Sequence, residues 1–242
     1  APPPAGEALR CARELAALLQ ARGELAEAVE LRQQVRDRRQ ATLGANHLET
    51  LASSVELAIA LRANGCLAEA EQLCRDALKG QEAQLGVGHG ETLRTISALA
   101  LCLKAQGKLK EAEELHRGSL RRLQQSHGNA LRPGTWHPRV LTSMTNLAAV
   151  LHEQGKLEEA RSLYVRVLES REKVLGADDA ATLNARNNLA CLLQDAGELD
   201  EAARMLRVVL ERREAALGPE HVDALTSANN LACCLQRLGG AG

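Results

Sequence analysis

Aromatic side chains are almost absent from this 242-residue sequence, which has no Phe and only one Trp and one Tyr, Trp136 and Tyr164. Apolar residues nevertheless make up 45% of the chain, enough for a buried core. Leu, Ala, Val and Cys must therefore fill the interior.

The sequence also lacks an excess of charge of one sign and a long hydrophobic run. It has 30 basic and 31 acidic residues, so we expect neither nucleic acid nor a membrane as partner. No stretch approaches the roughly 18 apolar residues of a membrane span. The start at Pro2, Pro3 and Pro4 lacks the basic and apolar regions of a signal peptide. We expect a cytoplasmic protein whose residues 1–7 form a disordered, proline-rich lead.

Features of catalytic and metal sites are missing as well. The seven cysteines are an odd number without zinc-ligand spacing. Cys191 and Cys233 share one repeat position, and Cys102 and Cys234 share another. We interpret them as small fillers of a core or groove, with a redox or metal role as the alternative. The sequence has no phosphate loop and no nucleophile elbow, so we expect no enzymatic activity, no cofactor and no metal.

What the sequence does contain is a repeat. The same phrase, such as GELAEA or GKLEEA, opens at Gly23, Gly65, Gly107, Gly155 and Gly197, and Gly239 continues the series without the phrase, with spacings of 42, 42, 48, 42 and 42 residues. Self-similarity at a fixed period predicts a stack of copied units in which each buries its apolar face against the next. Function is then expected on a surface that several copies build together.

Each unit reads as two antiparallel helices joined by a short turn. Between Thr182 and Leu217, apolar residues recur at helical spacing on both sides of Gly197. We therefore predict an all-α fold of about eleven helices in a single array, 8–239, with hairpins at 8–43, 50–85, 92–127, 137–175 and 179–217 and a closing helix at 221–238. Alanines recur where the paired helices should cross closely, at Ala58, Ala100, Ala148, Ala190 and Ala232 in the first helices and at Ala28, Ala70, Ala112, Ala160 and Ala202 in the second.

The links between units repeat too. A glycine is expected to end each second helix in a left-handed cap, at Gly44, Gly86, Gly128, Gly176 and Gly218. Pro138 favours the first helical position, which makes His137 the N-cap, and the equivalent N-caps are His47, His89, Asp179 and His221. A metal or catalytic role for these histidines is the alternative. They lie one per stacked unit, roughly 10 Å or more apart, so they should not converge on one ion.

One link carries six extra residues, which we place in an insertion loop at 128–138 between the third and fourth repeats. Insertions in repeat proteins map to loops on one edge. Trp136 lies in this loop, and two interpretations stay open: it packs on the base of its own loop, or it takes part in recognition.

The segment Asn187–Ala232 resembles the tetratricopeptide repeat in its 42-residue form, found in kinesin light chains and nephrocystin-3-like scaffolds. Leu189, Ala190, Gly197 and Ala202 match its core positions, and the likeness extends over 8–239. Cys74 and His116 depart from its aromatic positions. The resemblance implies a solenoid, a right-handed superhelix of helical hairpins. It also implies a non-enzymatic adaptor that binds a peptide or partner protein in a concave groove, with a structural scaffold in a larger signalling protein as the alternative.

In that family the first helices line the groove, and asparagines of the NNLA motif hold the backbone of an extended peptide. The matching residues are Asn187 and Asn188, Asn229 and Asn230, and Asn146 with its neighbour Thr145. The earlier copies do not match, since they read Ser97-Ala98, Val55-Glu56 and Arg13-Glu14. Independently of the family, Asn is a weak helix former, yet here it recurs mid-helix with a donor and an acceptor to offer. The alternative is that these amides join neighbouring units.

Helical phase adds further polar residues to the same face, namely Thr142, His152, Asn184, Gln194, Thr226 and Gln236. In the earlier units the face carries Arg94, Lys104 and Arg62, which suit an acidic or carboxylate-bearing peptide. The chain lacks the heptad coiled coil by which a kinesin light chain joins its heavy chain. Association with a cytoskeletal motor would therefore need regions outside this chain. The missing initiating Met and the end near Gly239 lead us to expect a fragment of a longer protein.

Overall fold

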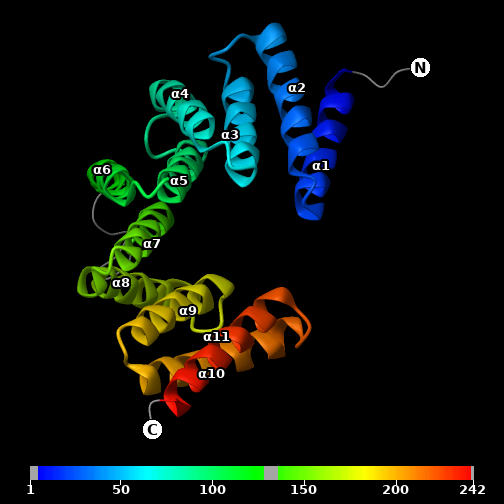
Figure 1. Ribbon diagram of the computed structural model, residues 1–242. Helices are drawn as coiled ribbons and strands as arrows, with labels where there is room; N and C mark the ends of the chain where they lie inside the picture. Colours follow the sequence, from blue (N-terminus) through cyan, green and yellow to red (C-terminus); the bar gives the residue numbers. More distant parts are fainter. Residues whose placement is uncertain (1–4, 128–135, 241–242) are drawn as a thin grey trace. The chain divides into compact units, whose positions relative to one another are not determined.

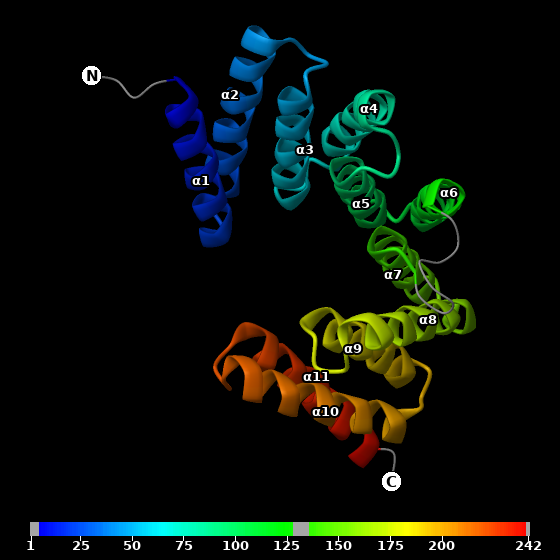
Figure 2. The same ribbon diagram turned by 180° about the vertical axis from the view of Figure 1, so that it is seen from behind.

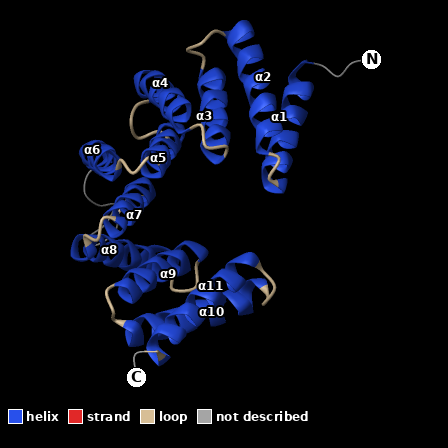
Figure 3. Ribbon diagram, in the orientation of Figure 1, coloured by secondary structure: helices blue, strands red, loops and turns tan. Residues whose placement is uncertain are grey.

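The computed structural model describes residues 5–127 and 136–240, which contain eleven α-helices and no strand (Figures 1 and 3). The all-α prediction is confirmed. The helices are α1 (Ala5–Arg22), α2 (Leu25–Leu43), α3 (Leu48–Ala63), α4 (Leu67–Leu85), α5 (Gly90–Ala105), α6 (Leu109–His127), α7 (Pro138–Glu153), α8 (Leu157–Leu175), α9 (Ala180–Asp195), α10 (Leu199–Leu217) and α11 (Val222–Gly239).

The chain divides into two compact units, Ala1–Ser126 and His127–Gly242. In unit 1, consecutive helices from α1 to α5 contact one another, and the first helices α3 and α5 also meet. In unit 2, the same holds from α7 to α11, with α9 and α11 also in contact (Figure 2). Each unit is thus a stack of helical hairpins, and the single array 8–239 stays a prediction.

The predicted helix N-caps are confirmed at all five positions. The imidazole Nδ1 of His47, His89 and His137 accepts a hydrogen bond from the backbone N–H two residues later, at 3.2 Å in each case. His221 does the same at 3.1 Å, and the carboxylate of Asp179 does so at 2.8 Å. These side chains satisfy a backbone donor that the helix leaves unpaired. The histidines of the links therefore serve as caps.

The predicted left-handed cap at the link glycines is wrong in its detail. Gly44 has φ 92° and ψ 160°, and Gly176 has φ 90° and ψ 168°, so the backbone is extended where a left-handed helical cap needs ψ near 50°. This region of positive φ is accessible to almost nothing but glycine. The chain leaves α2, α4, α8 and α10 in this extended conformation because it must run on to the next N-cap. The fifth predicted cap, Gly128, lies outside the described residues.

The glycine-terminated cap occurs instead at the turn inside each hairpin. After α9, the Gly197 N–H donates to the Gln194 carbonyl at 3.2 Å, and the Glu198 N–H donates to the Leu193 carbonyl at 2.9 Å. This pair of bonds is the Schellman motif, with Gly197 at φ 86°. The turn glycine therefore reverses the chain and closes the first helix.

The alanine columns lie where the sequence placed them. All five second-helix alanines and Ala58, Ala148 and Ala190 are fully buried, and Ala100 is 5% exposed. Ala232 is exposed, because α11 has no second helix paired with it among the described residues. Larger apolar side chains, such as Leu57, Leu99, Leu192 and Leu206, complete the core.

Two predicted segments differ from expectation or lie partly outside the described residues. Helix α1 begins at Ala5, so residues 5–7 are helical where a disordered lead was expected; residues 1–4 lie outside the described residues. The insertion 128–138 is described only from Trp136. There the backbone N–H of Trp136 donates to Ser170 Oγ at 3.0 Å, and the Arg166 guanidinium lies 4.9 Å from the centre of the Trp136 ring. Trp136 therefore packs on α8, a contact that neither of the two interpretations named, and a part in recognition stays a prediction.

The interpretation of the cysteines as core fillers holds for three residues. Cys74, Cys102 and Cys234 are buried fillers, Cys191 is half-buried, and Cys233, in the same repeat position as Cys191, is exposed.

Candidate functional site

The candidate site is the first-helix face of unit 2, the face formed by α7, α9 and α11. It carries nine of the eleven predicted groove residues, namely Thr145, Asn146, His152, Asn184, Asn187, Asn188, Gln194, Asn229 and Asn230. Corresponding positions in the repeats place these side chains in rows that run from one first helix to the next.

One of these rows contains an amide–amide bond between neighbouring repeats. Asn230 Nδ2 on α11 donates to Asn187 Oδ1 on α9 at 3.1 Å. The Asn187 amide also donates to Cys191 Sγ one turn along the same helix, at 3.9 Å. Both ends of the Asn187 side chain are thus bonded within the protein. For this asparagine the structure supports the alternative that amides join neighbouring units.

A second row links three first helices through a residue that sequence reasoning missed. His152 Nε2 on α7 lies 3.0 Å from Asp195 Oδ2 on α9, and Arg237 Nη1 on α11 donates to Asp195 Oδ1 at 3.0 Å. Asp195 is 43 residues after His152, the same separation as between Asn187 and Asn230. This recurring offset is the signal that could have identified Asp195.

Two other predicted groove residues bond to their own surroundings. Thr145 Oγ1 donates to the Leu141 carbonyl of its own helix at 2.9 Å. Asn184 Oδ1 accepts a short hydrogen bond from Arg213 on α10, which also donates to Ser227 Oγ at 2.7 Å. Arg213 is 6% exposed. Asn184 therefore belongs to a polar contact between second and first helices.

Other asparagines and a glutamine offer their amides to solvent. Asn188 and Gln194 are half-exposed, and Asn229 is exposed. Within the described residues, no hydrogen bond engages the amides of these three side chains. Asn146, the α7 counterpart of Asn188, is also half-exposed. Outward amides without a bond thus occur at both asparagine positions of the NNLA motif, at Asn229 in the first position and at Asn188 in the second.

The electrostatics of this face are mild. Burial raises the pKa of the Cys191 thiol, and the nearby Asp195 and Cys234 raise it further, so Cys191 is a neutral filler under Asn187. On α8 behind it, burial raises the pKa of Tyr164 to about 12. Neither group is set up to donate or accept protons near neutrality.

The remaining predicted groove residues, Arg94 and Lys104, lie on α5 in unit 1. Arg94 is exposed and pairs with Glu91 on its own helix, Nη1 to Oε1 at 3.0 Å. Lys104 is exposed near the end of α5. They belong to a different compact unit from the asparagine rows.

The described part of the chain contains no group of three or more histidine, cysteine or carboxylate side chains that could hold a metal ion. In the same part, no helix is long and apolar enough to cross a membrane.

Comparison with known families agrees with this architecture. Models of the tetratricopeptide repeat match residues 8–49, 50–125 and 139–215. These matches cover most of the sequence, so the chain belongs to the tetratricopeptide-repeat proteins.

Similar solved structures include kinesin light chain-like repeats. Two crystal structures of the nearly identical repeats of a putative kinesin light chain from Podosopora anserina share 32% identity with this chain. Each alignment covers 86% of this chain. The alignments cover 95% and 96% of the two solved chains, with TM-scores of 0.69 and 0.68. BtubC (BKLC) from P. vanneervenii shows the same fold, with 23% identity and a TM-score of 0.63. That alignment covers 90% of this chain and 82% of the BtubC chain. No curated protein sequence matches the chain significantly.

Proposed function

We propose that unit 2 is a non-enzymatic adaptor module that binds an extended peptide segment of a partner protein along its first-helix face. The observation that carries this proposal is the exposure of amide groups at helical positions where asparagine is a poor choice for helix stability. Asn188 and Asn229 have no hydrogen-bond partner in the described residues, although other side chains of the same rows do.

The individual asparagines of the motif then have different roles. Asn187 is bonded on both sides and holds α9 to α11. Asn188 and Asn230 face the ligand. The Asn188 amide has no bond within the described residues, and Asn230 bonds Asn187 through Nδ2 alone, which leaves its Oδ1 for another donor. An amide with both donor and acceptor can pair with a peptide backbone without selecting its sequence. Sequence preference would come from His152 and Gln194 at the far end of the face.

The alternative function is a structural spacer in a larger nephrocystin-3-like protein. The Asn187–Asn230 bond and the contacts of Asp195 with His152 and Arg237 favour it, because they stiffen the stack without any ligand. The partner's identity, a cytoplasmic location and any link to a cytoskeletal motor through regions outside this chain belong to the proposal.

Two adjacent asparagines provide a matched experiment. A peptide array screened with the purified chain would select a ligand, and fluorescence anisotropy would give its affinity. Replacing Asn188 by Ala should weaken binding by about 1 to 2 kcal/mol, the cost of a lost buried hydrogen bond, and leave the melting temperature nearly unchanged.

Replacing Asn187 by Ala should lower the melting temperature, because it removes the acceptor of Asn230. The proposal is refuted if Asn188→Ala melts several degrees early yet binds the selected peptide normally at low temperature. An array that yields no ligand would favour the spacer.

A further inference from the structure

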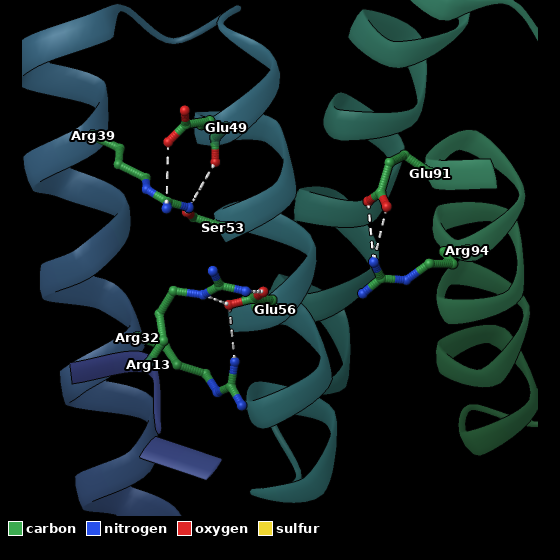
Figure 4. A network of polar contacts seen from close by, with 8 residues as sticks. All are labelled: Arg13, Arg32, Arg39, Glu49, Ser53, Glu56, Glu91 and Arg94. Atoms are coloured by element: carbon green, nitrogen blue, oxygen red, sulfur yellow. Dashed lines mark hydrogen bonds and ion pairs between the residues drawn. The ribbon is translucent and has the colours of Figure 1, made fainter. Parts of the chain in front are cut away.

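Unit 1 has a hollow lined mainly by arginines, which we call the arginine hollow. It lies on the first-helix side, between α1, α2, α3 and α5, and has a volume of about 440 Å³. Its polar lining consists of Arg10, Arg13, Glu14, Arg32, Glu56 and Arg94, and Ala17 and Ile59 add an apolar part. Figure 4 shows how Arg13 and Arg32 converge on Glu56 while Arg94 extends from the neighbouring helix.

Glu56 organises the arginines at the base of the hollow. Arg13 Nε donates to Glu56 Oε2 at 3.0 Å, Arg13 Nη2 to Glu56 Oε1 at 2.5 Å, and Arg32 Nη1 to Glu56 Oε2 at 3.3 Å. Arg13 and Glu56 are 43 residues apart, so this ion pair occupies the same place between adjacent first helices as the Asn187–Asn230 pair of unit 2. The Arg32 side chain is 12% exposed. The fold therefore holds the guanidinium groups of Arg13 and Arg32 in place before any ligand binds.

The arginines retain donors beyond those that Glu56 uses. Arg32 Nε is buried without a hydrogen-bond partner, and a guanidinium carries five N–H donors in total. At the rim, the exposed Arg94 pairs with Glu91 of its own helix and, among the described residues, with nothing else. Arg10 Nε lies 3.9 Å from Glu14 Oε1, and both of these side chains are exposed. Exposed pairs of this kind contribute little energy and exchange easily.

Charge in the hollow is unbalanced. Its lining holds four guanidinium groups and two carboxylates, so two positive charges remain. Glu91 lies outside the lining, and its ion pair with Arg94 partly neutralises one of these positive charges. An anion that enters is met by several arginines, whose planar forks suit tetrahedral and planar oxyanions.

We propose that the arginine hollow binds a phosphorylated serine or threonine side chain of a partner protein. A phosphate group carries a charge of about −1.5 to −2 at neutral pH, which matches the surplus charge of the hollow, and its three acceptor oxygens can be shared among the arginines. Ala17 and Ile59 would contact the neighbouring apolar part of the peptide.

A peptide suits this hollow better than a nucleotide does. Recognition of a base uses aromatic stacking, and both Trp136 and Tyr164 lie in unit 2. The site is also separate from the asparagine rows of the proposed function, so each can fail without the other. Asn188→Ala should leave binding at the arginine hollow unchanged.

The test uses the full 242-residue chain and three fluorescein-labelled peptides that differ at one position, which is phosphoserine, Glu or Ser. Anisotropy titrations should show the phosphoserine peptide binding about tenfold more tightly than the Glu peptide, with no binding of the Ser peptide. Inorganic phosphate should compete, and affinity should fall as salt rises. Replacing the exposed Arg94 by Ala should weaken binding about tenfold, whereas Arg121→Ala, an exposed arginine of α6, should have no effect.

A second variant tests the role of Glu56. Glu56→Gln keeps an acceptor for Arg13 and Arg32 but removes a competing charge, so phosphopeptide affinity should rise severalfold at low salt. Thermal melts would establish that each variant is folded. The proposal is wrong if the phosphoserine and Glu peptides bind equally, if Arg94→Ala behaves like Arg121→Ala, or if folded Glu56→Gln binds more weakly. Stronger competition by adenosine monophosphate than by free phosphoserine would identify a nucleotide site instead.

Discussion

Acid should destabilise unit 1 through one buried histidine. His116 lies in α6, is 3% exposed, and burial lowers its pKa from 6.5 to about 4. Because the folded pKa is depressed, the unfolded chain binds the proton first. The neutral folded form is favoured above pH 6.5, and this stability is lost as the pH falls from 6.5 toward 4.

The magnitude follows from proton linkage. A separation between pKa values of 6.5 and about 4 removes about 3 kcal/mol of unfolding free energy once the pH is below both. At pH 5 the loss is about 2 kcal/mol. This is a large part of the stability of an ordinary domain.

The matched variant is His116→Leu, because Leu206 occupies the equivalent position of the fifth hairpin and is fully buried there. Urea unfolding at pH 7 and pH 5, followed by circular dichroism, should show a stability loss in the natural chain that exceeds that of His116→Leu by about 2 kcal/mol. Other titrating groups are common to both proteins and cancel in the comparison. The reasoning is refuted if the two proteins lose the same stability between these pH values.

Three further predictions concern the repeat itself. Ala202→Leu should cost roughly 1 to 3 kcal/mol of unfolding free energy because Ala202 is fully buried, against a few tenths for Ala215→Leu at an exposed position of the same helix. Gly176→Ala should destabilise because Gly176 has φ 90°, whereas Gly118→Ala, inside α6 with nothing within 4 Å, should stabilise by about 0.5 to 1 kcal/mol. Asp179→Ala should cost about 1 kcal/mol through the lost N-cap bond to the Ala181 N–H.

Urea midpoints measure all five variants. Equal midpoints for Ala202→Leu and Ala215→Leu would contradict the assigned helix crossing. A stabilising Gly176→Ala would show that the link does not need positive φ. An Asp179→Ala chain as stable as the natural one would mean that water replaces the cap without loss.

Several features of the hairpins were predictable because they depend on neighbours in sequence. The 42-residue period located the hairpins, and His47, Asp179 and their equivalents were recognised as N-caps from Pro138 alone. The alanine columns followed from the same register. Helix capping and helical phase act over a few residues, so a single sequence contains the information.

The link glycines show where local rules reach their limit. The sequence indicated correctly that Gly44 and Gly176 need positive φ, but it could not give ψ. That angle depends on where the next helix must begin, and the packing of neighbouring hairpins decides this.

Contacts between repeats were decided by the tertiary structure alone. Of two adjacent asparagines with the same sequence signature, Asn187 is bonded to Asn230 and Asn188 is not, because only one of them faces the next first helix. Arg13 and Glu56 meet for the same reason, although nothing in their local sequence relates them. The sequence by itself determined which residues repeat and which helices they form. Only the packing of one repeat on the next decided which of those residues meet, because a side chain's direction across a stack depends on the angle between helices that are distant in the chain.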